Sequence, residues 1–219
     1  MTDDLLKTYR FDPLSGMPPR QLVIFLHGFG ADGRDLIGLA PEFAPSLPEA
    51  LFLSPDAPFP CDMAPSGRQW FSLEDWSPDS LLRGVQNAAP LLTGYIAQQI
   101  EKHGVVTAKT ALVGFSQGTM TALYAGPRYP EKLAGVLGYS GALIWEEGVD
   151  PETLHKIPVY LAHGEADMVV PVPAYAHAVE NLTQAGFSVT GHTTPGLPHG
   201  IDGAGIVAGR TFLQRVLST

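Results

Sequence analysis

The sequence predicts an α/β fold with a mostly parallel central sheet, and three observations lead to that class. Short continuous apolar runs, rich in β-branched and aromatic side chains, recur along the chain as expected for strands covered on both faces. Segments with apolar residues at helical spacing separate these runs, and strands that alternate with helices build parallel sheets. One run ends in a Gly-x-Ser-x-Gly motif, Gly114–Gly118, after which a helical pattern begins. The length of 219 residues, without a repeat or a low-complexity linker, fits one domain over residues 1–219.

Six strands are expected, and glycines mark the end of the first one. It stops at three glycines within Gly28–Gly33, which let the backbone bend close to a neighbouring group. Asp32 or Asp35 could then cap a short helix that runs through Leu39. The last of the six is predicted to be an edge strand. The expected strands are 22–27, 51–55, 111–115, 133–139, 159–163 and 187–193.

The longest expected helix starts at Asp79, where apolar residues begin to recur at helical spacing, and Gly104 is well placed to stop it. Pro90 lies inside this pattern and is expected to kink the helix or to split it. Further helices are expected directly after Ser116 and up to Pro130, over 173–185 and over 201–217.

The stretch from 56 to 78 is predicted to be a long loop. It is dense in proline, tryptophan and polar residues and shows no clear periodicity. A loop of this length in a compact domain is usually functional or covers a site.

Composition excludes several classes of protein. Hydrophobic residues make up 45% and charged residues 16% of the chain, as in globular proteins. The 22 acidic and 13 basic side chains give a net charge of -9, and no cluster of lysine or arginine could follow a phosphate backbone, so nucleic acid is not an expected partner. We find neither a phosphate loop nor a Cys/His ligand set, and therefore expect no metal and no organic cofactor.

The first residues, the length of the apolar runs and the cysteine content indicate a cellular compartment. The acidic start lacks a long apolar region, and no apolar run approaches the length of a membrane span, so we expect a cytoplasmic protein without integral membrane association. The single cysteine, Cys61, permits no internal disulfide and is interpreted as an incidental small apolar residue.

The serine turn is the first candidate for chemistry. If a strand turns into a helix within one residue, that residue is strained and its neighbours must lack bulk, as Gly114 and Gly118 do. Ser116 would then be exposed at the carboxyl end of the sheet. The helix begun by Gln117 would direct N–H groups and a positive dipole end toward an oxyanion beside it. The pentapeptide alone leaves the choice between an ordinary turn and a nucleophile open.

A serine nucleophile needs a base, normally a histidine that a carboxylate orients. Since ligands sit at the carboxyl ends of parallel strands, the loops after each strand are the places to search. The loop after 159–163 carries Glu165 and Asp167, and the segment after the last strand carries His199. The resulting order, serine, acid, histidine, is the one found with this kind of serine turn.

Three other histidines compete with His199 for the role of base. His27 and His163 precede glycines at strand ends and are interpreted as buried structural residues that bond loop backbone. His192 lies within a predicted strand.

Four motifs together resemble those of the carboxylesterase and acyl-protein thioesterase (lysophospholipase-like) group of the α/β-hydrolase superfamily. They are Leu26–Gly33, Gly114–Gly118, His163–Pro171 and His199–Gly200, and they follow one another in the family's order. The resemblance covers nearly the whole chain from about residue 20. It implies the α/β-hydrolase fold with helices on both faces of the sheet and no large cap domain.

The resemblance also implies roles for individual residues. Ser116 would be the nucleophile, Asp167, preferred to Glu165, the orienting acid, and His199 the base. The backbone N–H groups of Phe29 and Gln117 would form the oxyanion hole. Two departures are visible: Thr119 stands where many members carry glycine, and Pro198 precedes the histidine where a flexible residue is usual.

The function implied is a serine carboxylic-ester hydrolase that acts on short to medium acyl esters through an acyl-enzyme. An acyl-protein thioesterase or a lysophospholipase would use the same site, and a non-catalytic hydrolase-fold binding protein is the alternative from another class. Exposed apolar loops would face a small or lipid-like acyl ester or a second subunit in a homodimer. Residues in loops expected to converge on the site form the hypothetical acyl pocket: Trp70, Phe71, Ile144, Trp145 and Met168.

Overall fold

A seven-stranded sheet forms the centre of the computed structural model, which describes residues 4–218. Its strand order is β1-β3-β2-β6-β7-β8-β9; β1 pairs antiparallel with β3, and the pairs from β3 to β9 are parallel. The predicted α/β class and the predicted edge position of β9 are therefore confirmed. The strands are β1 Thr8–Phe11, β2 Gln21–Leu26, β3 Ala50–Pro55, β6 Thr110–Phe115, β7 Gly135–Tyr139, β8 Val159–Gly164 and β9 Val189–Thr194.

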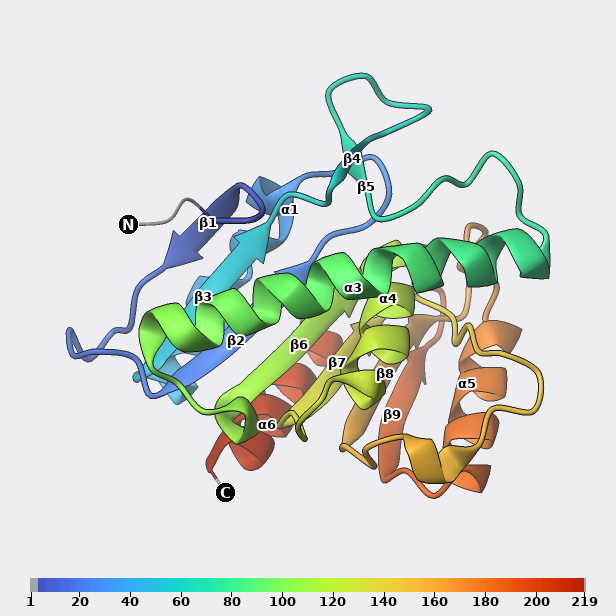
Figure 1. Cartoon of the computed structure of the whole chain (residues 1–219). Coiled ribbons are helices and arrows are strands. Elements are labelled where there is room, and N and C mark those ends of the chain that lie inside the picture. The colour runs from blue at the N-terminus through green and yellow to red at the C-terminus, as the bar shows by residue number, and fades with distance from the viewer. Residues whose placement is uncertain (1–3, 219) are drawn as a thin grey trace.

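Helices cover both faces of the sheet, so the molecule has three layers (Figure 1). Leu22 and Ile24 of β2 point into a core with α3, α4 and α5, whereas Val23 and Phe25 point into a second core with α1, α2 and α6. This alternation follows from the two-residue period of a strand. The helices are α1 Gly33–Ile37, α2 Ala40–Phe43, α3 Pro78–His103, α4 Gln117–Ala125, α5 Pro173–Gln184 and α6 Gly203–Ser218. Short 3₁₀ turns occupy Ala44–Ser46, Thr107–Lys109, Gly126–Arg128 and Pro151–Thr153.

The long helix α3 runs through Pro90 as one helix, so of the two expected outcomes, a kink or a split, the split does not occur. Proline removes the N–H that would bond the carbonyl of Gln86. Because Pro90 and Gln86 are both exposed, that carbonyl can bond water instead. The Ser77 side chain caps the start of α3, and Gly104 ends it with φ +64°, as predicted.

The loop 56–78 contains a two-stranded ribbon that the sequence did not indicate, β4 Phe59–Pro60 and β5 Arg68–Gln69. It follows β3 and projects beyond the carboxyl end of that strand, above the middle of α3 in Figure 1. None of the helices between residues 4 and 218 combines the length and apolar character that a membrane crossing needs.

Candidate active site

Ser116 occupies the junction between β6 and α4 with φ 52° and ψ −117°, a conformation that L-residues rarely adopt. Its backbone N–H donates to the carbonyl of Tyr139 (2.9 Å), and its own carbonyl accepts from the N–H of Met120 (3.2 Å). The two glycines of the motif permit this turn. A Cβ at Gly118 would collide with the carbonyl of Leu26, and one at Gly114 would lie 2.5 Å from the Cα of Thr119. The helix is therefore pressed against the sheet at the point where the serine is held up.

Asp167 and His199 form a hydrogen-bonded pair beside this turn. The Nδ1 of His199 lies 2.7 Å from Oδ2 of Asp167, and the Asp167 carboxylate is buried. Burial by itself would raise the pKa of Asp167. Hydrogen bonds from His199 and from the backbone N–H groups of Val170 and Val169 outweigh it and hold that pKa below the usual value. The carboxylate is thus kept charged against the imidazole.

Ser116 and His199 line one cavity of about 330 Å³. The ring of His199 packs against that of Phe115, with centroids 4.9 Å apart. Within the described part of the chain, no hydrogen bond joins the Ser116 hydroxyl to His199; such bonds are often long before substrate binds. The walls are mostly apolar: Gly28, Phe29, Met63, Leu73, Trp76, Phe115, Ser116, Gln117, Met120, Val169 and His199.

Phe29, in the loop after β2, and Gln117, at the start of α4, line this same cavity. Gln117 is the first residue of α4, where backbone N–H groups have no partner within the helix. The loop of Phe29 is held in place by two backbone bonds, from the N–H of Gly30 to Arg68 and from the N–H of Arg68 to Ala31. In residues 4–218, no backbone acceptor pairs with the N–H of Phe29 or of Gln117. Both donors are thus available to an oxygen in the cavity.

The side chain of Gln117 has a function that the sequence did not reveal. It is fully buried, accepts from the N–H of Trp70 (2.9 Å) and donates to the carbonyl of Phe71 (2.8 Å). The indole N–H of Trp70 donates to the carbonyl of His27 (3.0 Å). The loop 56–78 is therefore tied to the serine turn and to the end of β2.

Glu165 and His27, which compete for the roles of acid and base, make hydrogen bonds outside the Ser116 cavity. Glu165 is exposed and accepts from the hydroxyl of Thr193. His27 is buried between the carbonyl of Gly28 and the N–H of Ala57, and burial lowers its pKa. This is the backbone-bonding role expected of it.

The other two histidines also lie away from the cavity. His163 is buried, with Nε2 2.7 Å from the carbonyl of Val170 and 3.4 Å from Asp167. His192, on β9, pairs with the hydroxyl of Tyr160.

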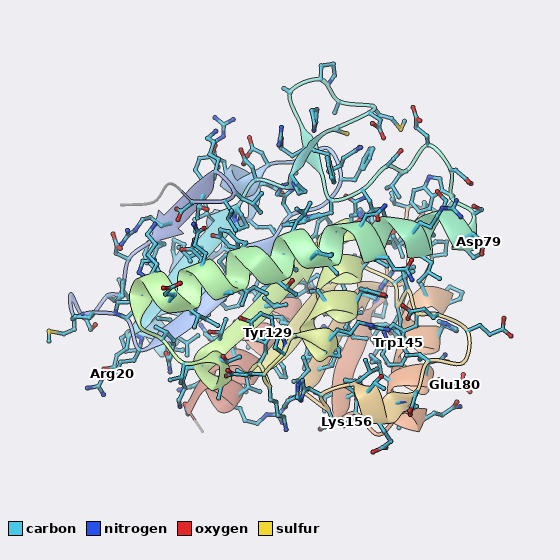
Figure 2. The ribbon with its side chains drawn as sticks, in the orientation of Figure 1. Arg20, Asp79, Tyr129, Trp145, Lys156 and Glu180 are labelled. Carbon is cyan, nitrogen blue, oxygen red and sulfur yellow. The ribbon has the colours of Figure 1, made fainter. Side chains whose placement is uncertain are left out.

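The five residues expected to form an acyl pocket are not among those that line the cavity beside Ser116. Trp70 is fully buried, Phe71 packs against Gly84 of α3, and Met168 points outward with 90% of its surface exposed. Ile144 and Trp145 line a second, larger cavity together with His177 and Asn181 of α5. Figure 2 shows Trp145 between α4 and α5. The difference arises because the path of a loop, and not its composition, decides which side chains face inward.

The sequence model of the family described as Phospholipase/Carboxylesterase matches residues 14–217. The chain belongs to this family. Its fold is the α/β-hydrolase fold, and as a member of the carboxylesterase family it is an ester hydrolase.

Individual relatives agree with that membership. The chain is similar to esterase YpfH of Escherichia coli (strain K12), with 31% identity over 84% of this chain and 78% of that protein. It is similar to acyl-protein thioesterase 1 of Gibberella zeae, with 31% identity over 81% of this chain and 82% of that protein. The solved structure of esterase PE8 superposes with a TM-score of 0.91 at 37% identity, covering 97% of this chain and 99% of that one.

Some of the residues that line the cavity of this carboxylesterase can be expected from their spacing relative to Ser116, and others cannot. Phe115 and Gln117 flank the serine, and Met120 follows it by one helical turn, so all three are neighbours of Ser116 by spacing alone. Three further residues carry no such signal because they reach the cavity through the irregular loop 56–78; they are Met63, Leu73 and Trp76. Within the described residues, no three Cys, His, Asp or Glu side chains lie close enough to hold a metal ion.

Proposed function

We propose that this enzyme hydrolyses short to medium acyl esters through Ser116, His199 and Asp167. One observation carries the proposal: a serine in a strained strand-to-helix turn shares a cavity with a histidine whose far nitrogen is bonded to a buried carboxylate. Phe29 and Gln117, whose backbone N–H groups pair with no backbone carbonyl in residues 4–218, line the same cavity and support their assignment as the oxyanion hole.

The mechanism follows from these positions. His199 takes the hydroxyl proton as Oγ of Ser116 attacks the acyl carbonyl, and the N–H groups of Phe29 and Gln117 bind the oxyanion. The intermediate collapses, and the leaving alcohol takes the proton from His199. Water then attacks the acyl-enzyme by the same route, while Asp167 stabilises the imidazolium that forms in each half-reaction.

The cavity supports a preference for shorter acyl groups. Its volume of about 330 Å³ lies at the small end of ligand pockets, and its walls are largely apolar. Met63 and Trp76, 75% and 50% exposed, stand on its rim, so longer chains would extend along solvent-exposed apolar surface.

Replacing Ser116 by alanine tests the nucleophile. We expect kcat for a p-nitrophenyl ester to fall at least about a thousandfold, because the covalent step is lost while binding groups remain. A fluorophosphonate probe should label the wild-type chain at Ser116 and leave the variant unlabelled. Retention of a tenth of wild-type turnover by Ser116→Ala would refute the assignment. An unlabelled wild-type chain without turnover would favour a binding protein on this fold.

The acyl preference is tested with p-nitrophenyl esters from acetyl to palmitoyl and a matched thioester series. We expect kcat/KM to be highest for short to medium chains and to fall for palmitoyl, because the cavity cannot enclose the whole chain. A maximum at palmitoyl, or a large preference for the thioester, would instead favour the acyl-protein thioesterase or lysophospholipase alternative. The homodimer stays a prediction that sedimentation of the purified chain can examine.

A further inference from the structure

Thr119 of α4 is almost completely buried, and its side chain makes two bonds to one residue of the sheet. Its hydroxyl donates to the carbonyl of Tyr139 (2.9 Å) and accepts from the backbone N–H of Tyr139 (3.0 Å). Tyr139 is the last residue of β7, at the level where β6 leaves the sheet to form the serine turn. The hydroxyl of Thr119 therefore bonds both the N–H and the carbonyl of Tyr139 at the point where β6 has left the sheet.

The same carbonyl of Tyr139 also accepts from the N–H of Ser116 (2.9 Å). One oxygen atom thus holds both the strained residue and the hydroxyl of Thr119. A strained backbone persists only where surrounding contacts over-determine it, and this carbonyl is one such contact. If the Tyr139 peptide moves, Ser116 moves with it.

Two glycines make room for the side chain of Thr119. A Cβ at Gly138 would lie 2.6 Å from the Cγ2 of Thr119, and a Cβ at Gly141 would collide with the Cβ of Thr119. The methyl group therefore fills a space that the end of β7 leaves open. This contact fixes the rotamer in which the hydroxyl reaches Tyr139.

The end of β7 also reaches the loop of His199. Ser140 has φ 47°, a second strained non-glycine residue, and its N–H donates to the carbonyl of Ala162 (2.9 Å). Its hydroxyl donates to the carbonyl of Gly200 (3.2 Å), the residue after His199. The Tyr139–Ser140 segment is thereby bonded to Ser116 on one side and to the histidine loop on the other.

We propose that Thr119 is a positioning residue that sets the place of Ser116 relative to His199 through Tyr139–Ser140. The inference rests on the proposed function, because it assumes that Ser116 attacks and His199 accepts its proton.

The test compares Thr119→Val, which removes the hydroxyl, with Thr119→Ser, which keeps it. Thr110→Val is the matched control, since Thr110 is a fully buried threonine at the opposite end of β6. We expect Thr119→Val to lower kcat and the rate of fluorophosphonate labelling roughly tenfold. KM should stay within about twofold because Thr119 does not line the cavity. Thr119→Ser should restore most of kcat, and Thr110→Val should leave it unchanged.

A purely structural role for Thr119 would lower the melting temperature and leave kcat of the folded variant at the level of Thr110→Val; that result overturns the proposal. If Thr119→Val does not fold, Ser140→Ala carries the test, because it removes only the bond to Gly200 and should lower kcat several-fold at unchanged KM. An unchanged kcat in Ser140→Ala would then reject the link. Failure of the proposed function is seen separately, as activity that survives in Ser116→Ala.

Discussion

The two carboxylate oxygens of Asp167 face different partners. Oδ1 accepts from the backbone N–H groups of Val169 (2.8 Å) and Val170 (2.9 Å), and Oδ2 faces the Nδ1 of His199. The first oxygen fixes the rotation of the group, and the second therefore points at the imidazole without freedom to turn away. The Nε2 of His163 lies 3.4 Å from the same Oδ2, so nitrogen atoms face both oxygens of the carboxylate.

Asp167→Asn should lower kcat by about a thousandfold or more. An amide has one accepting oxygen and one NH₂ group, so in either orientation the NH₂ group of the substituted side chain must face a donor, and the imidazole loses its orientation. Glu165→Gln is the matched control, and kcat should stay within about twofold because Glu165 is exposed and bonded to Thr193. The measurement is kcat near neutral pH with a short p-nitrophenyl ester. The opposite ranking of these two variants would make Glu165 the acid and contradict the assignment.

The lowered pKa of Asp167 also bears on how the enzyme responds to acid. Because this pKa lies below its usual value, the carboxylate keeps its charge at pH values where a free aspartate begins to take up a proton. Stability that the charged carboxylate contributes is present above the unfolded-state pKa and is lost as the pH falls through the lowered folded-state pKa. Loss of wild-type activity in mildly acidic buffer would therefore not arise from Asp167. A pH profile of kcat/KM with a short p-nitrophenyl ester checks this expectation.

At the scale of elements, the buried side-chain amide of Gln117 hydrogen-bonds the loop 56–78 to α4. Replacing Gln117 by leucine would leave the N–H of Trp70 and the carbonyl of Phe71 buried without partners. We expect this to cost about 2–5 kcal/mol of unfolding free energy. The melting temperature should fall by about 5–15 °C.

Limited trypsin digestion reports on the loop itself, since Arg68 is the one Lys or Arg within residues 56–78. Cleavage after Arg68 should be faster in Gln117→Leu than in wild type. Gln99→Leu is the control, because Gln99 is an equally buried amide on α3 that is bonded to Asp4 and not to this loop. Equal cleavage rates in both variants would show that the amide does not hold the loop.

The elements that could be predicted are those with a local signal. The strands β2, β3, β6 and β8 are largely buried on both faces and read as continuous apolar runs. Strand β1 was missed because its four residues are only partly buried and depend on a distant partner, with Thr8 of β1 opposite Pro55 of β3. Strands β4 and β5 are two residues long, too short for any period to show.

At the scale of the whole molecule, the site is assembled from loops at one edge of the sheet. The loops after β2, β6, β8 and β9 bring four residues together as parallel topology requires: Phe29, Ser116, Asp167 and His199. The loops of Ser116, Asp167 and His199 could be found from the sequence because each follows a recognisable strand. The choice of Asp167 over Glu165 and the role of Phe29 came instead from the resemblance to the family. The pocket residues of the loop 56–78 could not be found, since their directions depend on the path of an irregular loop.

Gly118 restricts how this enzyme can change. Any larger side chain at this position would push α4 away from Leu26, so the serine turn cannot accept one without moving the helix. Among the cavity residues on loop 56–78, Met63 and Trp76 are exposed and carry no such restriction, whereas Leu73 is buried in the core. New substrate ranges are therefore open to selection, natural or in the laboratory, at Met63 and Trp76, while the chemical step beneath them stays the same.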